Sequence, residues 1–178
     1  SRGLGDVYKR QVLFFISFSI CLIKFIKKYE ICTMLQLDFP NYTFKIKNNV
    51  NGDYIFDEIR KKYIKLTKEE WVRQNCVKFL INEKNFSPVL INIEKTIKIN
   101  KQIKRYDIVV YKPDGGIKLL VECKSPEIKI NQKTFDQIAI YNMNLKSELL
   151  MVTNGLRHYY CEINYNNKCY TFLKDINN

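Results

Sequence analysis

The sequence predicts a mixed α/β fold, in which helices pack on a central mixed β-sheet and flank it. Two observations lead to this prediction. Segments with the apolar spacing of a helix alternate along the chain with segments that have the character of strands. Turn signals between neighbouring strand segments also indicate hairpins. The predicted order is a helix, three antiparallel strands, a second helix, one strand and a final strand pair.

The first predicted helix and strand lie between residues 67 and 99. Thr67 is a favourable helix N-cap. An apolar helix face follows it at Val72, Cys76, Phe79 and Leu80. The next segment changes to the alternation of a strand, with apolar residues at Ile91, Ile93, Ile97 and Ile99.

The two most apolar strand segments are RYDIVVY (105–111) and LLVECKSP (119–126), on either side of the turn PDGG. They form a predicted hairpin. A four-residue loop from Pro113 to Gly116 would set Lys112 opposite Ile117, and the same register would set Asp107 opposite Glu122.

The last third of the chain completes the predicted sheet. NQKTFDQIAIYNMNLK has helical spacing at Phe135 and Ile138. SELLMVTNG reads as a buried strand that ends at Asn154 and Gly155, and LRHYYCEINYNNKCYTFL reads as a hairpin that turns at Asn166 and Asn167.

The two opposed carboxylates need a physical reason, because like charges facing each other across a sheet are destabilising. A cation between Asp107 and Glu122 would supply one, and Mg²⁺ takes one or two carboxylates together with water and phosphate oxygens. The predicted site therefore consists of Asp107, Glu122 and the main-chain carbonyl of Cys123. Lys124 projects from the same face as Glu122 and would position or deprotonate an attacking water. A surface ion pair is the alternative, since Glu-x-Lys recurs at residues 127–129.

The 178 residues carry a net charge of +12, which favours an anionic partner such as nucleic acid or a membrane surface. A solvated lysine-rich face is the alternative. DVYKRQ (6–11) is what a transposon-based sequencing adapter encodes, and the apolar stretch after it is short for a spanning helix and contains Lys24. We expect residues 1–33 to be an artefact or a non-globular leader and residues 34–178 to be one domain without a membrane segment. A small membrane-attached protein is the weaker alternative.

Cysteine usage indicates the compartment. The four cysteines after residue 34 form no C-x-x-C pair, and no histidine stands near them at ligand spacing. This argues against a zinc site or a disulfide framework and favours reduced thiols in a cytoplasmic protein.

Six segments in the same order resemble a known family. These are LTKEEWVRQ, INIEKTIKI, RYDIVVY, LLVECKSP, FDQIAIYN and MVTNGLRHYY, between residues 66 and 160. Asp107 followed by Glu122-Cys123-Lys124 resembles the PD-(D/E)xK nuclease superfamily, although Tyr106 replaces its usual proline. The whole set resembles the N-terminal nuclease domain of type I restriction enzyme R subunits, which implies a restriction-endonuclease-like core.

The resemblance implies a role for each matching residue. Asp107 and Glu122 would bind the metal, and Lys124 would be the catalytic lysine. Gln137 and Tyr141 match the Q-x-x-x-Y element of the family and lie on one helical face. Gln137 would contact the site or the DNA backbone. Tyr141 would support the site, unless it is a core aromatic and Gln137 a solvated amide.

The family also places a glutamate of the first helix at the metal site. Glu70 stands three residues after Thr67 and reads as the partner in a capping box. Glu69 lies close to the apolar face and is four residues before Arg73, so we expect Glu69 at the site and Arg73 in support. Glu94 is a third candidate for this glutamate, although an ordinary strand residue is the favoured interpretation.

The remaining candidates have weaker support. His158 is expected to be structural or exposed, because no sequence feature orients it. Six lysines could follow DNA phosphates or solvate the sheet, and these are Lys95, Lys98, Lys101, Lys104, Lys112 and Lys118.

The resemblance implies a Mg²⁺-dependent endonuclease, with Mn²⁺ as a substitute, acting on double-stranded DNA alongside restriction-modification partner subunits. The alternative is a non-catalytic module that keeps the fold to bind nucleic acid or protein. No P-loop of the helicase kind occurs in this sequence. A fragment of a longer subunit and a free-standing relative therefore both stay open.

Overall fold

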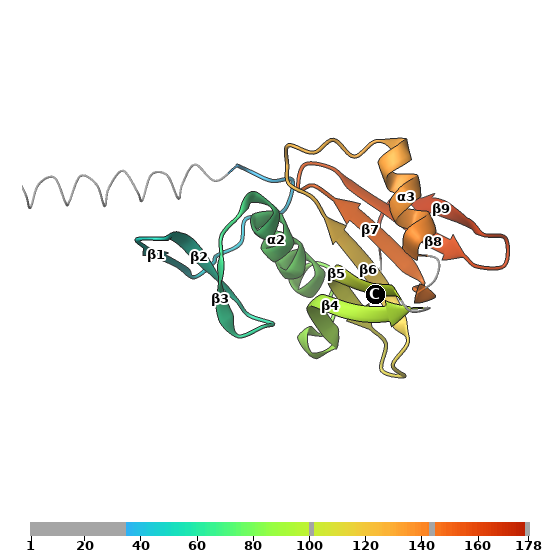
Figure 1. Ribbon diagram of the computed structural model, residues 1–178, viewed down its shortest axis with the longest axis horizontal. Helices are drawn as coiled ribbons and strands as arrows, with labels where there is room; N and C mark the ends of the chain where they lie inside the picture. The colour runs from blue at the N-terminus through green and yellow to red at the C-terminus, as the bar shows by residue number, and fades with distance from the viewer. Residues whose placement is uncertain (1–34, 100–101, 143–144, 177–178) are drawn as a thin grey trace, which may run out of the picture. The chain divides into compact units, whose positions relative to one another are not determined.

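The computed structural model describes residues 35–99, 102–142 and 145–176. From Leu37 onward these residues belong to one unit, which contains two β-sheets and two α-helices within the described ranges (Figure 1). The expectations for residues 1–33 concern a segment outside those ranges.

The larger sheet has six strands in the spatial order β4-β5-β6-β7-β8-β9. The strands are β4 (Ile91–Ile99), β5 (Gln102–Tyr111), β6 (Ile117–Cys123), β7 (Leu149–Thr153), β8 (His158–Asn164) and β9 (Cys169–Leu173). Neighbours are antiparallel except β6 and β7, which run parallel. A parallel pair needs a crossover connection, and here it contains helix α3 (Gln132–Asn142). The predicted mixed α/β fold is therefore confirmed.

A smaller sheet precedes this core, and the sequence analysis did not predict it. It is an antiparallel meander of β1 (Ile46–Asn49), β2 (Gly52–Asp57) and β3 (Lys62–Lys65). These strands are short and rich in Lys, Asn and Asp, so they lack the apolar runs that mark a strand. Of their residues, only Ile55 and Asp57 are buried.

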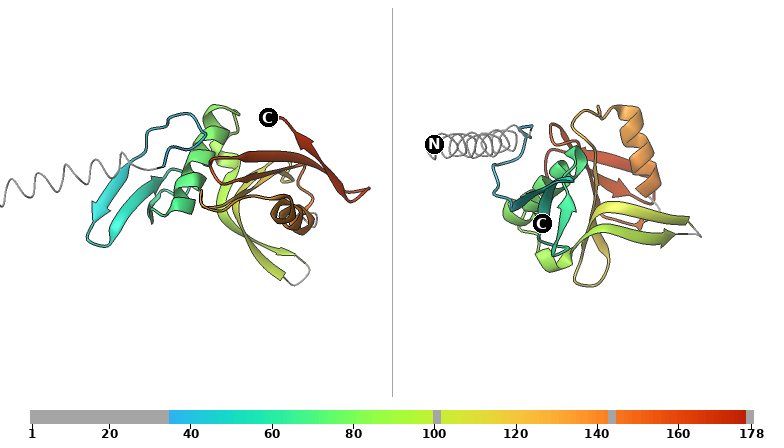
Figure 2. Two further views of the ribbon diagram at one scale, coloured as in Figure 1. Left: turned by 90° about the horizontal axis from the view of Figure 1, so that it is seen from above. Right: turned by 60° about the vertical axis from the view of Figure 1, so that its left-hand side comes forward.

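The two helices cover opposite faces of the large sheet (Figures 1 and 2). Helix α2 (Lys68–Asn82) buries Val72, Cys76 and Leu80 against one face, together with inward residues of β5, β6 and β7. Helix α3 buries Phe135 and Ala139 in a separate cluster on the other face. A short 3-10 helix (Pro88–Leu90) connects α2 to β4. Consecutive residues of β6 and β7 alternate between the two clusters, which explains the continuous apolar runs 119–121 and 149–152.

The β5–β6 hairpin differs from its predicted loop. Tyr111, and not Lys112, lies opposite Ile117, and a bulge follows because Val110 pairs with Leu119. Lys112 closes the loop instead, since its N–H donates to the carbonyl of Gly116 at 2.7 Å. Beyond the bulge the predicted register holds. The last pair, Ile108 with Val121, makes Asp107 and Glu122 the next residues on their strands.

Gly155 illustrates how tightly the end of β7 packs against α2. Its φ of +81° lies in the left-handed region, and an added Cβ would lie 2.7 Å from Leu37 Cδ2 and 3.0 Å from Val72 Cγ2. We expect Gly155→Ala to lower the free energy of unfolding by about 2–3 kcal/mol, from backbone strain and overpacking together. Gly115→Ala is the matched control, because Gly115 has a φ of +88° and open space around it. Urea denaturation of both variants tests this, and equal losses would contradict the packing argument.

Candidate active site

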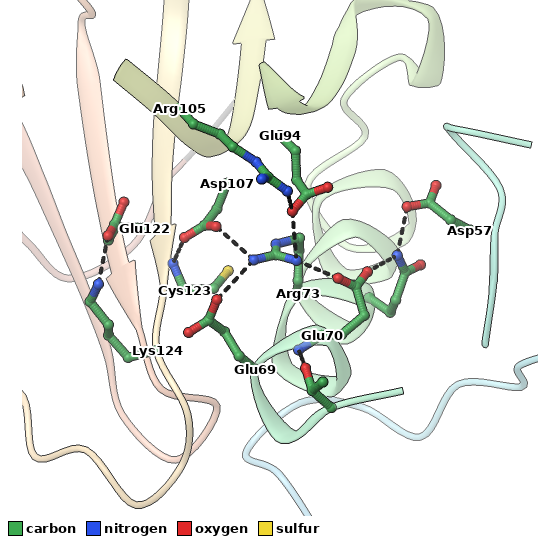
Figure 3. Close-up of polar contacts among 12 residues, drawn as sticks. Asp57, Glu69, Glu70, Arg73, Glu94, Arg105, Asp107, Glu122, Cys123 and Lys124 are labelled. Atoms are coloured by element: carbon green, nitrogen blue, oxygen red, sulfur yellow. Dashed lines mark hydrogen bonds and ion pairs between the residues drawn. The ribbon is translucent and has the colours of Figure 1, made fainter. Parts of the chain in front are cut away.

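The candidate site forms where β5 and β6 stop pairing. The N–H of Cys123 donates to Asp107 Oδ2 at 2.7 Å (Figure 3). A buried N–H needs an acceptor, and the Asp107 carboxylate supplies it at the point where the strand pairs end. Asp107 is therefore held against the main chain of the segment that carries the Glu-x-Lys motif.

Glu122 and Lys124 form an ion pair beside Asp107. Lys124 Nζ lies 2.7 Å from Glu122 Oε1, and both side chains are partly buried. Burial raises the pKa of Glu122, and the negative charge of Asp107 raises it further, while Lys124 opposes both. Burial opposes the charge of Lys124, but the hydrogen bond to Glu122 and the nearby carboxylate charges together outweigh it and raise the pKa of Lys124. Lys124 is thus an ammonium at neutral pH, which favours charge stabilisation over proton abstraction.

Arg73 of α2 holds the other oxygen of Asp107. Its Nη2 lies 2.7 Å from Asp107 Oδ1 and 3.0 Å from Glu69 Oε1, and its Nη1 pairs with Glu70. Burial disfavours the charge on Arg73, but Asp107 and Glu70 outweigh that effect and raise its pKa. The guanidinium therefore neutralises the acids on the α2 side of the site.

Glu69 lies on the site side of α2, where the sequence analysis expected it. Its negative charge contributes to the raised pKa of both Glu122 and Lys124. It also bonds to Arg73, as the spacing of four residues predicted. Glu69, Asp107, Glu122 and Lys124 thus lie close enough to interact electrostatically.

Glu70 does not behave as the predicted capping-box partner. Its N–H does donate to the Thr67 hydroxyl at 3.1 Å, so Thr67 caps the helix. Its buried carboxylate, however, accepts hydrogen bonds from Arg60 at 2.6 Å, from Gln74 at 2.8 Å and from Arg73. Electrostatic pairing with two arginines outweighs a return bond to the cap, because a buried carboxylate needs compensation.

Glu94 is not an ordinary strand residue, and that expectation was wrong. Its φ of +52° interrupts β4 next to the position of Asp107. Its carboxylate pairs with Arg60 and Arg105, and its Oε1 lies 3.7 Å from Arg73 Nη1. Strain of this kind persists only where surrounding interactions hold it. Glu94 therefore belongs to the charge network around Arg73, which no sequence pattern revealed.

This network also reaches the small sheet. Asp57 is fully buried at the end of β2 and accepts hydrogen bonds from Arg60 Nε at 2.5 Å and Gln74 Nε2 at 2.8 Å. Asp57 and Arg60 were missed because they stand before the segments that resemble the family. Spacing alone gave no signal for them.

The Q-x-x-x-Y element lies on α3, on the other face of the large sheet. Gln137 is exposed, and its side chain forms no hydrogen bond with the described part of the chain. The side chain of Tyr141 lies outside the described residues. The roles suggested for Gln137 and Tyr141 therefore stay predictions.

The metal ligands also stay predictions. Within residues 35–99, 102–142 and 145–176, no three acidic, histidine or cysteine side chains are grouped closely enough to hold a metal ion. Asp107 and Glu122 are paired with different cations, Arg73 and Lys124. Asp107 and Glu122 influence each other through their charges but are held in two separate ion pairs, so a shared metal position stays a prediction.

His158 has a structural environment. Its Nδ1 lies 2.8 Å from Thr153 Oγ1 and its Nε2 lies 2.7 Å from the carbonyl of Asp38, so His158 is structural, the first of the two predicted alternatives. Its ring also lies 4.4 Å from that of Phe39. Burial lowers the pKa of His158, because it disfavours the imidazolium.

The lowered pKa of His158 predicts a pH effect on stability. The unfolded chain takes up this proton more readily than the folded chain, so stability is full above the ordinary histidine pKa of about 6.5 and falls as the pH drops below it. We expect His158→Gln to have a flatter stability profile between about pH 7 and pH 5. Urea titrations across that range test this, and parallel profiles for the two proteins would contradict it.

Comparison with protein families matches residues 68–177 to the type I restriction enzyme R protein N terminus. The chain belongs to this family. The resemblance found in the sequence is thereby confirmed, and the matched segment contains the whole Asp107, Glu122 and Lys124 set. Asp57, Arg60 and the small sheet precede it.

Two further comparisons add little. A solved structure, a candidate nuclease of DUF820 from Anabaena variabilis ATCC 29413, aligns with 72% of this chain and 80% of its own at a TM-score of 0.42 and 11% identity. That likeness is too distant to support an argument about the site. None of the curated proteins matches the chain.

Two other expectations concern the whole chain. None of the helices in the described ranges has the length and apolar character needed to cross a membrane. The four cysteines after residue 34 are free thiols, and Cys76, Cys123 and Cys161 are buried.

Proposed function

We propose that this domain is a Mg²⁺-dependent DNA endonuclease of the type I restriction R-subunit kind. The main support is the placement of Asp107, Glu122 and Lys124 where β5 and β6 stop pairing. The charge of Asp107 acts on Glu122 there, and Lys124 is held against Glu122. Family membership supports the same assignment.

The donor set fits a hard divalent cation. Asp107, Glu122 and the carbonyl of Cys123 offer only oxygen atoms, which Mg²⁺ and Mn²⁺ prefer. The hydroxyl of Tyr106 is buried without a hydrogen-bond partner among the described residues, and burial together with the charge of Glu122 raises its pKa to about 12. A cation near Glu122 would add to the compensation that Lys124 provides. A bound metal would lower the pKa of its water and polarise the scissile phosphate.

The chain's own residues then have distinct tasks. Lys124 carries its positive charge next to Glu122, so it can stabilise negative charge that develops on the phosphate. Arg73 holds Asp107 on its α2 side, and the Cys123 N–H holds its other oxygen. Glu69 adds a further carboxylate at the edge of the site. The substrate would be double-stranded DNA, with recognition supplied by restriction-modification partner subunits in the cytoplasm.

A second function is favoured by one specific observation. Each of the two central carboxylates already has a cationic partner within the chain. A non-catalytic module that binds nucleic acid or protein would need no metal to keep these charges compensated. It would bind DNA in a salt-sensitive manner and leave it intact.

Incubation with supercoiled plasmid distinguishes the two functions. We expect nicked product with Mg²⁺ or Mn²⁺, none with EDTA, and none from Asp107→Asn under any condition. Asp114→Asn is the matched control, because Asp114 lies in the exposed β5–β6 loop away from the site. Intact plasmid after incubation of the folded wild type with either metal would reject the endonuclease and favour the binding module.

A further inference from the structure

The small sheet has an exposed face on which aromatic and basic side chains alternate. Lys47 pairs with Tyr54, Tyr54 pairs with Lys65, and Phe56 pairs with Tyr63. Directly paired residues share a face, and so do residues two apart. The resulting surface, called the outer face below, consists of Lys45, Lys47, Tyr54, Phe56, Tyr63 and Lys65.

The other face of this sheet is the one that packs inward. Ile55, which alternates with the outer-face residues of β2, is fully buried. Its cross-strand neighbours Ile46 and Ile64 are half-buried. The outer face has no such cover, since Tyr63 is 44% exposed and its three lysines are exposed.

The aromatic rings of the outer face are packed against each other and against lysines. The rings of Phe56 and Tyr63 lie 5.2 Å apart in an edge-to-face arrangement. Lys45 Nζ lies 5.7 Å from the centre of the Phe56 ring, and Lys47 Nζ lies 6.0 Å from the centre of the Tyr63 ring. These contacts hold two ammonium groups next to an exposed aromatic surface.

The charge of the outer face is not compensated by the chain. Among the described residues Lys45, Lys47 and Lys65 form no salt bridge, whereas Lys68, Lys78, Lys84, Lys112, Lys118 and Lys124 all do. The acidic residues of the small sheet, Asp53 and Asp57, alternate with Tyr54 and Phe56 and so belong to the opposite face. The outer face is therefore positive and aromatic, with no carboxylate of its own.

We infer that the outer face binds a single strand of nucleic acid. Unpaired bases can stack on the exposed ring of Tyr63, and the three lysines can neutralise the phosphates of the same strand. A duplex keeps its bases stacked on each other, so it would use the lysines and leave the aromatic ring without a partner. The inference does not depend on the proposed nuclease, because the small sheet precedes the matched family segment and shares no residue with the metal site.

Fluorescence anisotropy with a labelled 12-nucleotide oligothymidylate in EDTA tests the inference without any cleavage. The wild-type chain should bind the single strand more tightly than a 12-base-pair duplex. With three phosphates neutralised, the logarithm of the binding constant should fall with the logarithm of salt concentration with a slope of about −2. Equal affinity for the duplex would overturn the inference.

Variants separate stacking from charge. Tyr63→Leu should weaken binding roughly 5- to 150-fold, whereas Tyr63→Phe, which keeps the ring, should bind like wild type. Phe172→Leu is the matched control, because Phe172 is 47% exposed on β9 and outside the outer face. Lys47→Gln should reduce the salt slope by about 0.7, and Lys168→Gln should not change it.

Thermal melting of every variant guards against misfolding. If Tyr63→Leu does not fold, the comparison of Lys47→Gln with Lys168→Gln tests the inference, because Lys47→Gln leaves the aromatic rings in place. Folded Tyr63→Leu that binds the oligonucleotide like wild type would overturn the inference. An unchanged salt slope in Lys47→Gln would do the same.

Discussion

Lys124→Ala is expected to abolish plasmid nicking, lowering the cleavage rate by roughly 10²- to 10⁴-fold. Lys124 is the one basic residue in direct contact with Glu122 among the described residues, and its pKa is raised, so it supplies a permanent positive charge next to the proposed metal site. Its loss removes that charge where the phosphate would develop negative charge. It leaves both carboxylates in place, so binding of Mn²⁺ should persist when cleavage is lost.

Single-turnover cleavage and Mn²⁺ titration by calorimetry measure the two effects separately. The chain offers a matched control in its second Glu-x-Lys copy. Glu127 pairs with Lys68, and Lys129 is exposed, so Lys129→Ala should cleave like wild type. If Lys129→Ala loses as much activity as Lys124→Ala, the loss does not depend on the position of Lys124 beside Glu122. If Lys124→Ala keeps wild-type activity, Lys124 is not catalytic.

The central part of the fold could be predicted because its segments are long and strongly patterned. Residues 119–121 and 149–152 form continuous apolar runs since both faces of β6 and β7 are covered by helices. The register near Asp107 was also predicted correctly, although the assumed loop was wrong by one residue. The bulge between Val110 and Tyr111 absorbs that error before the strand ends.

The small sheet escaped prediction because its stability does not come from apolar runs of its own. Its strands bury one isoleucine fully, and the turn after β2 is held by the buried ion pair between Asp57 and Arg60. Such a pair depends on groups far away in sequence, here Glu70 and Gln74 of α2. The spacing of apolar and polar residues within the small sheet carries no information about this ion pair.

The candidate site was predicted in part for the same reason. Asp107 precedes the apolar run 108–111, whereas Glu122 and Lys124 follow the apolar run 119–121, so the hairpin register alone placed Asp107 next to Glu122. Arg73 was also predicted, from its spacing of four residues to Glu69, but Arg60 and Arg105 could not be, because they reach Glu94 across elements. Glu94 itself was misjudged because its positive φ results from tertiary contacts and leaves no mark in the sequence.

Arg73→Gln is expected to lower the free energy of unfolding by about 3–5 kcal/mol, which is the usual cost of removing one partner from a buried ion pair. The side chain of Arg73 is nearly fully buried and bonds to Asp107 and Glu70. Its loss would leave Asp107 without a cationic partner and the buried Glu70 with Arg60 as its one remaining arginine. Arg157→Gln is the matched control, because Arg157 is exposed and forms no salt bridge among the described residues.

Guanidinium denaturation of both variants at pH 7 measures the size of this loss. A loss under about 1 kcal/mol at pH 7 would show that its ion pairs contribute little.

The same variant connects stability to the proposed metal site. In the wild type, Arg73 already compensates Asp107, so a divalent cation must compete with the guanidinium for part of that carboxylate's charge. In Arg73→Gln the competition is gone, and a cation that binds the folded state stabilises it by mass action. Mg²⁺ should therefore raise the melting temperature of Arg73→Gln more than that of the wild type. An equal rise in both proteins would mean that Arg73 and the metal do not compete for Asp107.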